Sequence, residues 1–389
     1  MTVAEITVQP RSRFLLVLLG LGTFAIGIDA FVVAGVLSAI SSDLSVSTAA
    51  SGQLVTIFAV SYAILAPLSA WALAGWSRRN TLLLAMTVFT IGNVLSAFAV
   101  SFEVLAASRI LAALGAASYT PQAVAAVSDL VPGERKGRAL SIVYGGMTVA
   151  TALGVPLGTL VGEILGWRAT FLLIVGLGIL SLAGLASVLP SLAAPGAHRL
   201  RDRLSAITQP AVLFTLSITF LAALSEHVSY SYISVILAET RWHDLPVLPI
   251  ALAFFGAGAV IGNFAAGYGT DRFGNRTVII VAVAAQSAAL LALSFFQSEA
   301  GLACLALFIW GIAGWMYLVP IQHRLLELSK SYGAFTVSLN SSVLYLGIGG
   351  GGAVGGAFIS FVSPSELGLL SFAIGLAALA NAFLAFRTR

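Results

Sequence analysis

The stretch from Phe14 to Leu37 constrains the fold of this chain more than any other part of the sequence. It is an apolar run long enough for a helix to cross a hydrocarbon core, which takes about 20 residues for roughly 30 Å. The run nevertheless carries one acid, Asp29, and a carboxylate inside a membrane helix costs about 2.5 to 3.5 kcal/mol on insertion scales. We therefore expect Asp29 to face a polar partner inside the protein or a water-filled cavity.

Composition extends this interpretation to the whole chain. Hydrophobic residues make up 59% of the 389 residues and charged residues only 9%, whereas about a quarter of the residues of soluble domains are charged. The sequence predicts an all-α membrane protein with about twelve spans. The predicted spans cover residues 14–37, 50–73, 80–100, 104–128, 138–162, 168–190, 211–237, 247–269, 277–296, 300–323, 334–361 and 366–386.

The remaining composition excludes several classes of site. The single cysteine, Cys304, excludes an internal disulfide framework, and the four histidines show no metal-ligand spacing. No GxxxxGK[ST] motif occurs, which argues against an ATP-driven pump. We expect no metal, no cofactor and no nucleic-acid partner.

The basic residues predict the orientation in the membrane. An even number of spans puts both termini on one side, and Lys and Arg are enriched in short cytoplasmic loops. Arg168 and Arg241 lie on the opposite side, and Arg109 lies inside a span. The other 16 of the 19 basic residues lie on the side of the termini: Arg11, Arg13, Arg78, Arg79, Arg135, Lys136, Arg138, Arg199, Arg201, Arg203, Arg272, Arg276, Arg324, Lys330, Arg387 and Arg389. Both termini are predicted to be cytoplasmic.

A polar, basic link at 191–210 divides the chain into an N-terminal six-helix bundle, 1–190, and a C-terminal one, 211–389. An offset of 197 residues relates the halves. It brings Asp29 onto Glu226, Ser141 onto Ser338, Gly154 onto Gly351 and Gly158 onto Gly355. We expect an internal repeat, with the site where the two halves meet.

Of the 15 acids, 13 fall in loops or at span ends, which leaves Asp29 and Glu226 inside spans. Each is 15 residues from the cytoplasmic start of its span, which is about 22 Å at the helical rise. Arg109 lies at a similar depth, so we hypothesise that it faces Asp29 and that Glu226 belongs to the opposite wall. The pair is either a structural lock or part of a transport path, on which intramembrane ionisable residues are usually found. His227 is either a proton relay or a packed polar residue.

Further polar and aromatic residues within the spans are candidates to line a substrate cavity, although each could instead pack between helices. Tyr230 shares a helix face with Glu226, and Tyr119 lies near the face of Arg109. The other candidates are Gln53, Gln122, Asn263, Trp310 and Asn340. The glycine-rich segment 347–356 lies within a span and favours close helix packing.

The segment GYGTDRFGNR at 267–276 resembles the cytoplasmic G-x-x-x-D-R-x-G-x-R motif of the major facilitator superfamily. The matching positions are Gly267, Asp271, Arg272, Gly274 and Arg276. The resemblance implies that this motif braces neighbouring helices and takes part in the inward–outward switch. The counterpart between spans two and three keeps Arg78 and Arg79 but lacks the Asp and the Gly.

Two further segments resemble motifs of the same family. LAASRILAALGAA is similar to the fourth-span motif, whose Arg, here Arg109, the family links to proton coupling. ALGVPLG at 152–158 resembles the fifth-span antiporter motif, with Gly154, Pro156 and Gly158, although Val155 stands between Gly154 and Pro156, where many members have Gly-Pro. With GWRATF, SYSYIS and SLNSS, the whole chain resembles the twelve-span drug/proton antiporter group, on the branch of sugar, nucleoside and chloramphenicol exporters.

The resemblance implies two six-helix bundles of the major facilitator fold that rock about a central site. We expect a non-enzymatic, proton-coupled exporter of drug-like or sugar-like molecules, a monomer in a bacterial inner membrane that uses a proton gradient. Asp29 and Glu226 are the candidate proton or cation sites, Arg109 tunes Asp29, and the fifth-span glycines with Pro156 form a hinge between the halves. The alternatives are an importer or uniporter of the same fold, or a transport-dead membrane sensor or scaffold.

Overall fold

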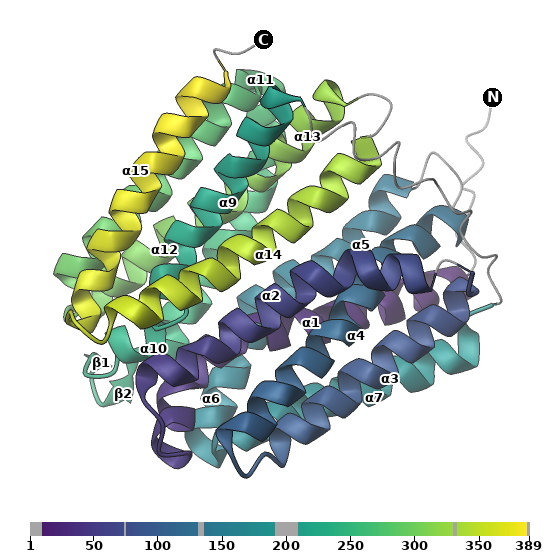
Figure 1. Cartoon of the computed structure of the whole chain (residues 1–389), viewed down its shortest axis with the longest axis horizontal. Helices are drawn as coiled ribbons and strands as arrows, with labels where there is room; N and C mark the ends of the chain where they lie inside the picture. The colour runs from purple at the N-terminus through teal and green to yellow at the C-terminus, as the bar shows by residue number, and fades with distance from the viewer. Residues whose placement is uncertain (1–9, 74, 131–135, 191–208, 330–332, 387–389) are drawn as a thin grey trace.

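The computed structural model describes residues 10–73, 75–130, 136–190, 209–329 and 333–386. Apart from one small hairpin, these residues form helices that run back and forth between two ends of the molecule (Figure 1). We call the end where the first helix begins and the last one finishes the terminal end, and the opposite end the far end. The link predicted at 191–210 falls almost entirely outside the described residues.

The helices of each half of the chain pack mainly against one another and form two bundles. The N-terminal bundle consists of α1 (Pro10–Asp43), α2 (Thr48–Ala72), α3 (Arg78–Ala97), α4 (Phe102–Leu130), α5 (Lys136–Val149), the π-helix η2 (Ala150–Gly154), α6 (Val155–Leu165) and α7 (Trp167–Val188). The C-terminal bundle consists of α9 (Pro210–Tyr230), α10 (Ile233–Ile236), β1 (Arg241–Trp242), β2 (Leu245–Pro246), α11 (Val247–Phe296), α12 (Ala300–Met316), α13 (Leu318–Leu328), α14 (Gly333–Phe358), the 3-10 helix η4 (Pro364–Glu366) and α15 (Leu367–Ala385).

The described helices supply the twelve predicted membrane crossings. Ten described segments are long and apolar enough to cross a bilayer. One of them, α11, has 50 residues and is interrupted at Gly274, whose φ of 78° favours glycine, so that it crosses twice. With α14, which is 26 residues long, the count reaches twelve, and the predicted all-α membrane fold is confirmed.

One predicted span, 211–237, is shorter in the structure. The helix α9 ends at Tyr230, and the chain turns at Tyr232, whose φ of −117° and ψ of 18° are not helical, before the short helix α10. The ring of Tyr232 lies against Gly355, and its hydroxyl donates to the carbonyl of Gly352 at 2.9 Å. The glycine-rich segment of α14 therefore accommodates this ring, which a sequence-only assignment of spans does not reveal.

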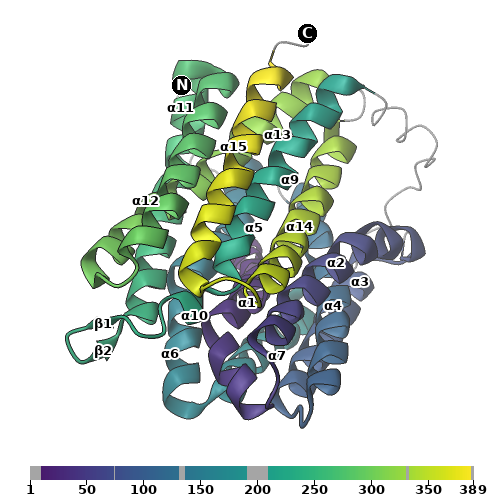
Figure 2. The same ribbon diagram turned by 60° about the vertical axis from the view of Figure 1, so that its left-hand side comes forward.

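The two bundles share a hydrophobic core toward the far end. One buried cluster joins Ala34, Leu37 and Val155 of the N-terminal bundle to residues around α10 and the start of α11. A separate cluster, which includes Val212 and Leu325, fills the terminal half of the C-terminal bundle. Figure 2 shows α10 beside α1 and α6, away from the chain termini.

Among the contacts that connect the bundles, we name three joints. In the joint between α2 and α14, the rings of Tyr62 and Tyr345 stack with their centroids 3.8 Å apart. In the joint between α11 and η2, Gly256 lies directly against the backbone of Ala152. In the joint between α1 and α10, the hydroxyl of Ser38 bonds that of Ser234 at 3.1 Å. These contacts come from the middle or the far half of their helices, so this conformation is closed at the far end.

The predicted internal repeat is visible in the packing. Gly154 lies against Ile28 of α1, and Gly351 lies against Leu224 of α9. Spans five and eleven therefore use equivalent glycines to approach equivalent turns of spans one and seven. The side chains of Ser141 and Ser338, which the same offset relates, lie outside the described part.

We expect the double variant Ser38→Cys/Ser234→Cys, made in a Cys304→Ser background, to form a disulfide on mild oxidation. The two hydroxyl oxygens are 3.1 Å apart, and a disulfide requires β-carbons about 3.5 to 4.5 Å apart. Mass spectrometry of peptides from the oxidised protein measures the yield, and the two single-cysteine variants are controls. A double variant that stays reduced in the membrane would contradict the closed far end.

We expect Gly256→Val to lower this cross-linking yield about tenfold, because the added side chain overlaps Ala152, and overpacking of this kind costs about 1 to 3 kcal/mol. The matched control is Gly176→Val, since a β-carbon at Gly176 of α7 meets no atom within 4 Å. Equal yields for the two valine variants would mean that the α11–η2 joint does not hold the far end closed.

Candidate functional site

A buried ion pair lies at the centre of the N-terminal bundle. Nη1 of Arg109 on α4 donates to Oδ1 of Asp29 on α1 at 2.5 Å, and Nη2 donates to the backbone carbonyl of Asp29 at 3.0 Å. The guanidinium also lies over the ring of Phe58, 4.4 Å from its centroid. The exposed fractions are 0% for Asp29 and 1% for Arg109, so the pair is sealed from water in this conformation. The hypothesised facing of the two residues is therefore present.

Close packing of α3 and α4 helps to position this pair. Gly92 of α3 lies against the backbone of Ala112, and Gly115 of α4 lies against that of Phe89. Because neither glycine has a side chain, the two helices approach closely, and the amide of Asn93 on α3 lies near the carboxylate of Asp29. Breaking such a buried pair by removing one partner costs about 3 to 5 kcal/mol.

Glu226 on α9 lies in a different setting, without a cationic partner among the described residues. Its carboxyl lies against Gly314 of α12, beside the amide of Gln286 on α11 and near the indole of Trp310. Its exposed fraction is 7%, compared with 0% for Asp29. Glu226 is therefore the less completely sealed of the two intramembrane acids.

Aromatic rings from both bundles surround the Glu226 region. The ring of Tyr230 lies 6.0 Å from Phe31 of α1, 5.3 Å from Phe255 and 5.9 Å from Trp310, measured between centroids. Nδ1 of His227 lies 3.0 Å from the carbonyl oxygen of Ala223, and Nε2 has no hydrogen-bond partner in the described structure. Phe31 thus brings the N-terminal bundle onto the helix that carries Glu226.

The two halves surround their acids in a related way. In the N-terminal bundle, the acid of the first span meets an amide from the third span and a guanidinium from the fourth. In the C-terminal bundle, Glu226 of the seventh span meets an amide, Gln286, from the ninth and an indole, Trp310, from the tenth. The equivalent acids therefore differ chiefly in whether the fourth helix of the bundle supplies a positive charge.

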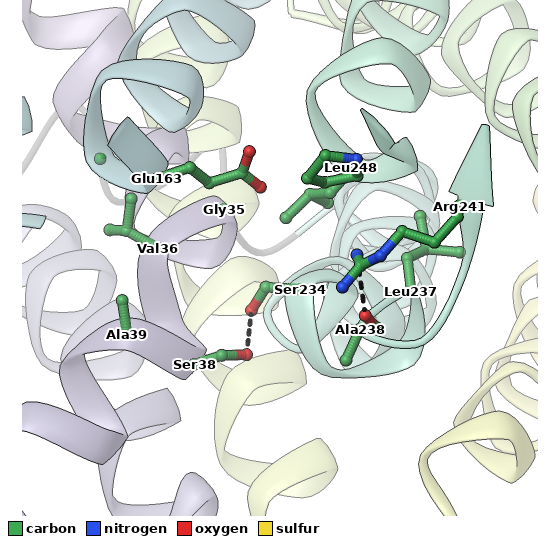
Figure 3. Close-up of a pocket in the computed structure, with 12 residues that line it drawn as sticks. Gly35, Val36, Ser38, Ala39, Glu163, Ser234, Leu237, Ala238, Arg241 and Leu248 are labelled. Carbon is green, nitrogen blue, oxygen red and sulfur yellow. Dashed lines mark hydrogen bonds between the residues drawn. The ribbon is translucent and has the colours of Figure 1, made fainter. Parts of the chain in front are cut away.

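A cavity of about 210 Å³ lies between the bundles at the far end (Figure 3). Glu163 on α6 and Arg241 on β1 lie on opposite sides of it, and the hydrogen bond between Ser38 and Ser234 lies beside it. The other lining residues are Gly35, Val36, Ala39, Gly162, Leu237, Ala238, Pro246 and Leu248. This cavity contains neither of the intramembrane acids.

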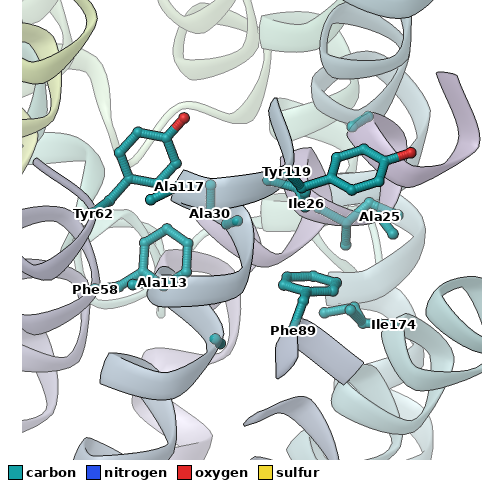
Figure 4. Close-up of a cluster of buried hydrophobic side chains, with 14 of the residues drawn as sticks. Ala25, Ile26, Ala30, Phe58, Tyr62, Phe89, Ala113, Ala117, Tyr119 and Ile174 are labelled. Carbon is teal, nitrogen blue, oxygen red and sulfur yellow. The ribbon is translucent and has the colours of Figure 1, made fainter. Parts of the chain in front are cut away.

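Two of the predicted cavity residues are instead buried inside a single bundle. Tyr119 is 0% exposed and lies in a cluster of buried hydrophobic side chains (Figure 4). Its hydroxyl donates to the carbonyl of Leu19 at 3.2 Å. Asn340 is 2% exposed, and its Oδ1 accepts from the hydroxyl of Thr219 at 2.7 Å. The prediction that they line a cavity is wrong for this conformation, because helix packing satisfies both polar groups.

The remaining cavity candidates are scattered. Gln53 lies in the α2–α14 joint, next to Gly356, and Gln122 accepts from Nη1 of Arg78 at 3.3 Å near the terminal end. Asn263 is exposed on α11 and makes no hydrogen bond within the described residues. Only Tyr230 and Trp310 of the predicted cavity residues gather beside Glu226.

The basic motif residues lie at the terminal end, where the structure brings only some of them into contact. Nη1 of Arg272 donates to the hydroxyl of Tyr268 at 2.9 Å, whereas Asp271, Arg276 and Gly274 are exposed. Asp271 makes no ion pair or hydrogen bond with the part of the chain that is described, so it does not brace a neighbouring helix in this conformation.

The counterpart of this motif does connect helices. Nε and Nη2 of Arg79 donate to the backbone carbonyls of Leu189 and Ala186, each at 2.8 Å, and so tie α3 to α7. Arg78 reaches α4 through Gln122. Both contacts stay within the N-terminal bundle.

The fifth-span residues do not form the predicted hinge between the halves. Gly154 lies against Ile28, and Gly158 lies against Val32, so both pack on α1 within their own bundle. They are one helical turn apart and share a face, and Pro156 occupies the first turn of α6. The opposite face of this span meets α11 through Ala152 of η2. The prediction that the fifth-span glycines form the contact between the halves is therefore wrong for this conformation.

Sequence reasoning missed Gln286, Phe31 and the stacked pair Tyr62–Tyr345. The sequence contains a usable signal for Gln286, because this residue is a polar amide within a predicted apolar span. The rings carried none, since aromatic residues are common in apolar spans and their contacts depend on how the helices are rotated.

The chain matches the family model described as Major Facilitator Superfamily over residues 19–328. It is 33% identical to the inner membrane transport protein YdhP of Escherichia coli (strain K12) over 355 residues, which cover 90% of each protein. It is 34% identical to a chloramphenicol resistance protein of Streptomyces lividans over 273 residues, 69% of each. A solved structure of a bacterial homolog of the human lysosomal transporter Spinster, inward-facing and occupied, matches 98% of each chain with a TM-score of 0.79 at 21% identity, which shows a common fold. With the fold, the family match and these relatives in agreement, the chain belongs to the major facilitator superfamily and is a membrane transporter, not an enzyme.

Proposed function

We propose that this transporter exports small amphipathic molecules in exchange for protons, by alternating access between its two bundles. The observation that carries the proposal is the buried acid on the first helix of each bundle, with Glu226 close to the contact between the bundles. The chloramphenicol resistance relative supports a drug-like substrate class. Substrate and protons would be the partners, with the proton gradient in place of a cofactor, and the chain would act as a monomer.

The orientation follows from the sorting of positive charge. With the basic terminal end in the cytoplasm of a bacterial inner membrane, the far end is the outer side. The joints at the far end then close the outer side of the transporter in this conformation. The exposed Asp271 motif at the terminal end is consistent with a cytoplasmic side whose brace is released.

The two acids have different roles in the proposed cycle. Glu226 retains some exposure and has no cationic partner among the residues that the structure describes, so it takes up and releases a proton as the bundles rock. Asp29 is neutralised by Arg109 and exchanges a proton only in a conformation that separates the pair. Each charge that moves inward through the membrane potential releases about 2.3 kcal/mol per 100 mV, which drives export.

The substrate would bind beside Glu226, between the bundles. Tyr230 and Trp310 supply aromatic surface there, and Phe31 completes it from α1. Such a surface suits an amphipathic molecule with one or two rings, because aromatic contacts provide a large apolar area with few polar demands. The hydroxyl of Tyr230, which lacks a hydrogen-bond partner in the described structure, would bind one of its polar groups.

We expect Glu226→Gln to abolish uphill efflux but to spare downhill exchange, because the amide occupies the space of a protonated acid and cannot release a proton. Accumulation of a phenicol in proteoliposomes with an imposed pH gradient measures the first property, and counterflow without a gradient measures the second. Uphill efflux should fall at least about tenfold, as the proton supplies the driving energy. The control Glu299→Gln, at an exposed acid, should transport as well as wild type. If Glu226→Gln keeps uphill efflux at the wild-type level, the proposed role of Glu226 is refuted.

We expect Asp29→Asn and Arg109→Gln each to destabilise the protein by about 3 to 5 kcal/mol, because each leaves a buried charge without its partner. The double variant Asp29→Asn/Arg109→Gln should recover most of that stability, as measured by thermal unfolding in detergent. If the pair takes part in coupling, uphill efflux stays low in the double variant; its recovery would assign the pair to structure alone.

The exposed pair Asp43–Arg168 provides the control for this cycle. Its N–O distance is 2.6 Å, but the two side chains are 46% and 39% exposed. Exposed pairs contribute about 0 to 1 kcal/mol, so neutralising both members should cost clearly less stability than either buried single variant and should leave efflux in place.

A further inference from the structure

The side-chain amide of Gln286 has a fixed orientation. Its Nε2 donates to the backbone carbonyl of Ala222 on α9 at 2.9 Å, and the side chain is 1% exposed. A carbonyl oxygen accepts only from the nitrogen side of an amide, so the amide oxygen must point elsewhere. That oxygen, Oε1, has no hydrogen-bond partner within the described residues.

The unpartnered oxygen of Gln286 and the carboxyl of Glu226 converge on Gly314. A β-carbon at Gly314 would lie 3.3 Å from Oε1 and 3.5 Å from Oε2 of Glu226, and 3.5 Å from Oε1 of Gln286. Two acceptor groups therefore meet in one buried place, with no described cationic side chain between them. Such a meeting is unfavourable unless a proton or a cation lies between the oxygens.

We propose that Glu226 is a neutral carboxylic acid in this conformation and donates its proton to Oε1 of Gln286, which makes Gln286 the positioning residue for the transported proton. The inference rests on the proposed proton coupling at Glu226 and deepens it. On loading, one carboxylate oxygen of Glu226 gains an O–H bond. On release, that bond breaks heterolytically and the proton passes to water, with no change of oxidation state.

The chemistry of the site favours a proton over a metal cation. A hard cation is held by about six oxygen ligands, whereas a shared proton needs only two oxygens. The meeting point offers the carboxyl of Glu226 and one amide oxygen, and its other neighbours are the indole of Trp310 and the Cα of Gly314. Gly314 keeps the space open, since any side chain there would press on both groups.

The other groups around Glu226 do not replace Gln286 as the acceptor of its proton. The indole N–H of Trp310 lies near the carboxyl, but it is a donor only and cannot accept a proton. The titratable neighbours are His227 and Tyr230 on α9 and Tyr317 between α12 and α13. Nδ1 of His227 is engaged with the carbonyl of Ala223, and from α1 the ring of Phe31 lies 6.3 Å from that of His227. No described arginine or lysine forms an ion pair with Glu226.

Infrared spectroscopy of the full-length protein in lipid nanodiscs tests this assignment, because a protonated carboxyl has a C=O stretch distinct from those of amides and carboxylates. At neutral pH the wild type should show a band that Glu226→Gln lacks. Gln286→Met removes the acceptor at similar volume. The band should then move to higher frequency, or it should disappear at a pH up to about one unit lower than in wild type, because the protonated acid has lost its hydrogen bond. The control Gln53→Met, at an amide in the α2–α14 joint, should leave the band unchanged.

A second variant keeps the test valid if Gln286→Met does not fold. Gly314→Ala places a methyl group against both side chains and should also shift the band. The inference is overturned if wild type has no such band at neutral pH, if the band ignores both variants, or if it appears only after Na⁺ is removed, which would indicate a cation site. These spectra do not depend on transport, so a band that responds to Gln286 in a protein without proton-driven efflux would refute the proposed function and leave the pairing intact.

Discussion

The cost of placing charge where no water can reach it governs this structure. An acid in the first span would be prohibitive if it faced lipid, and the fold offsets this cost by bringing Arg109 of α4 onto Asp29. The guanidinium also donates to the backbone carbonyl of Asp29 and lies over the ring of Phe58 on α2. Three helices of the N-terminal bundle are therefore joined at one point by a charge pair that is neutral overall.

The C-terminal bundle meets the same cost differently. Its equivalent acid, Glu226, lies among neutral groups, so it avoids the penalty most simply by carrying a proton. One bundle thus holds a compensated pair of charges, and the other holds an acid whose charge depends on contact with water. In the proposed proton-coupled cycle, a conformation that wets Glu226 would change its charge without disturbing the pair at Asp29.

Much of the fold and part of the site could be predicted from the sequence because they depend on distance along the chain. Span length follows from apolar runs, and the constant rise of a helix put Asp29 and Arg109 at the same depth before any packing was known. Rotation about the helix axes is set by packing between helices, which hydropathy does not encode. For this reason the sequence predicts that Tyr119 and Asn340 line a cavity, although both are buried in helix packing. For the same reason the sequence does not indicate that the amide of Gln286 lies near Glu226.

The joints between the bundles differ in a way that bears on how the bundles can move. At α2–α14 the rings of Tyr62 and Tyr345 stack, so separation there loses a specific aromatic contact. At α11–η2 the backbone of Gly256 meets the backbone of span five. In this part of span five the N–H of Val155 donates to the carbonyl of Ala150 in a π-helical turn, and Pro156 has no N–H to donate. Backbone packed on backbone without interlocking side chains can slide with little loss of contact. The α11–η2 joint therefore has few specific side-chain contacts to lose when the bundles move, while the stacked rings give the α2–α14 joint a defined position.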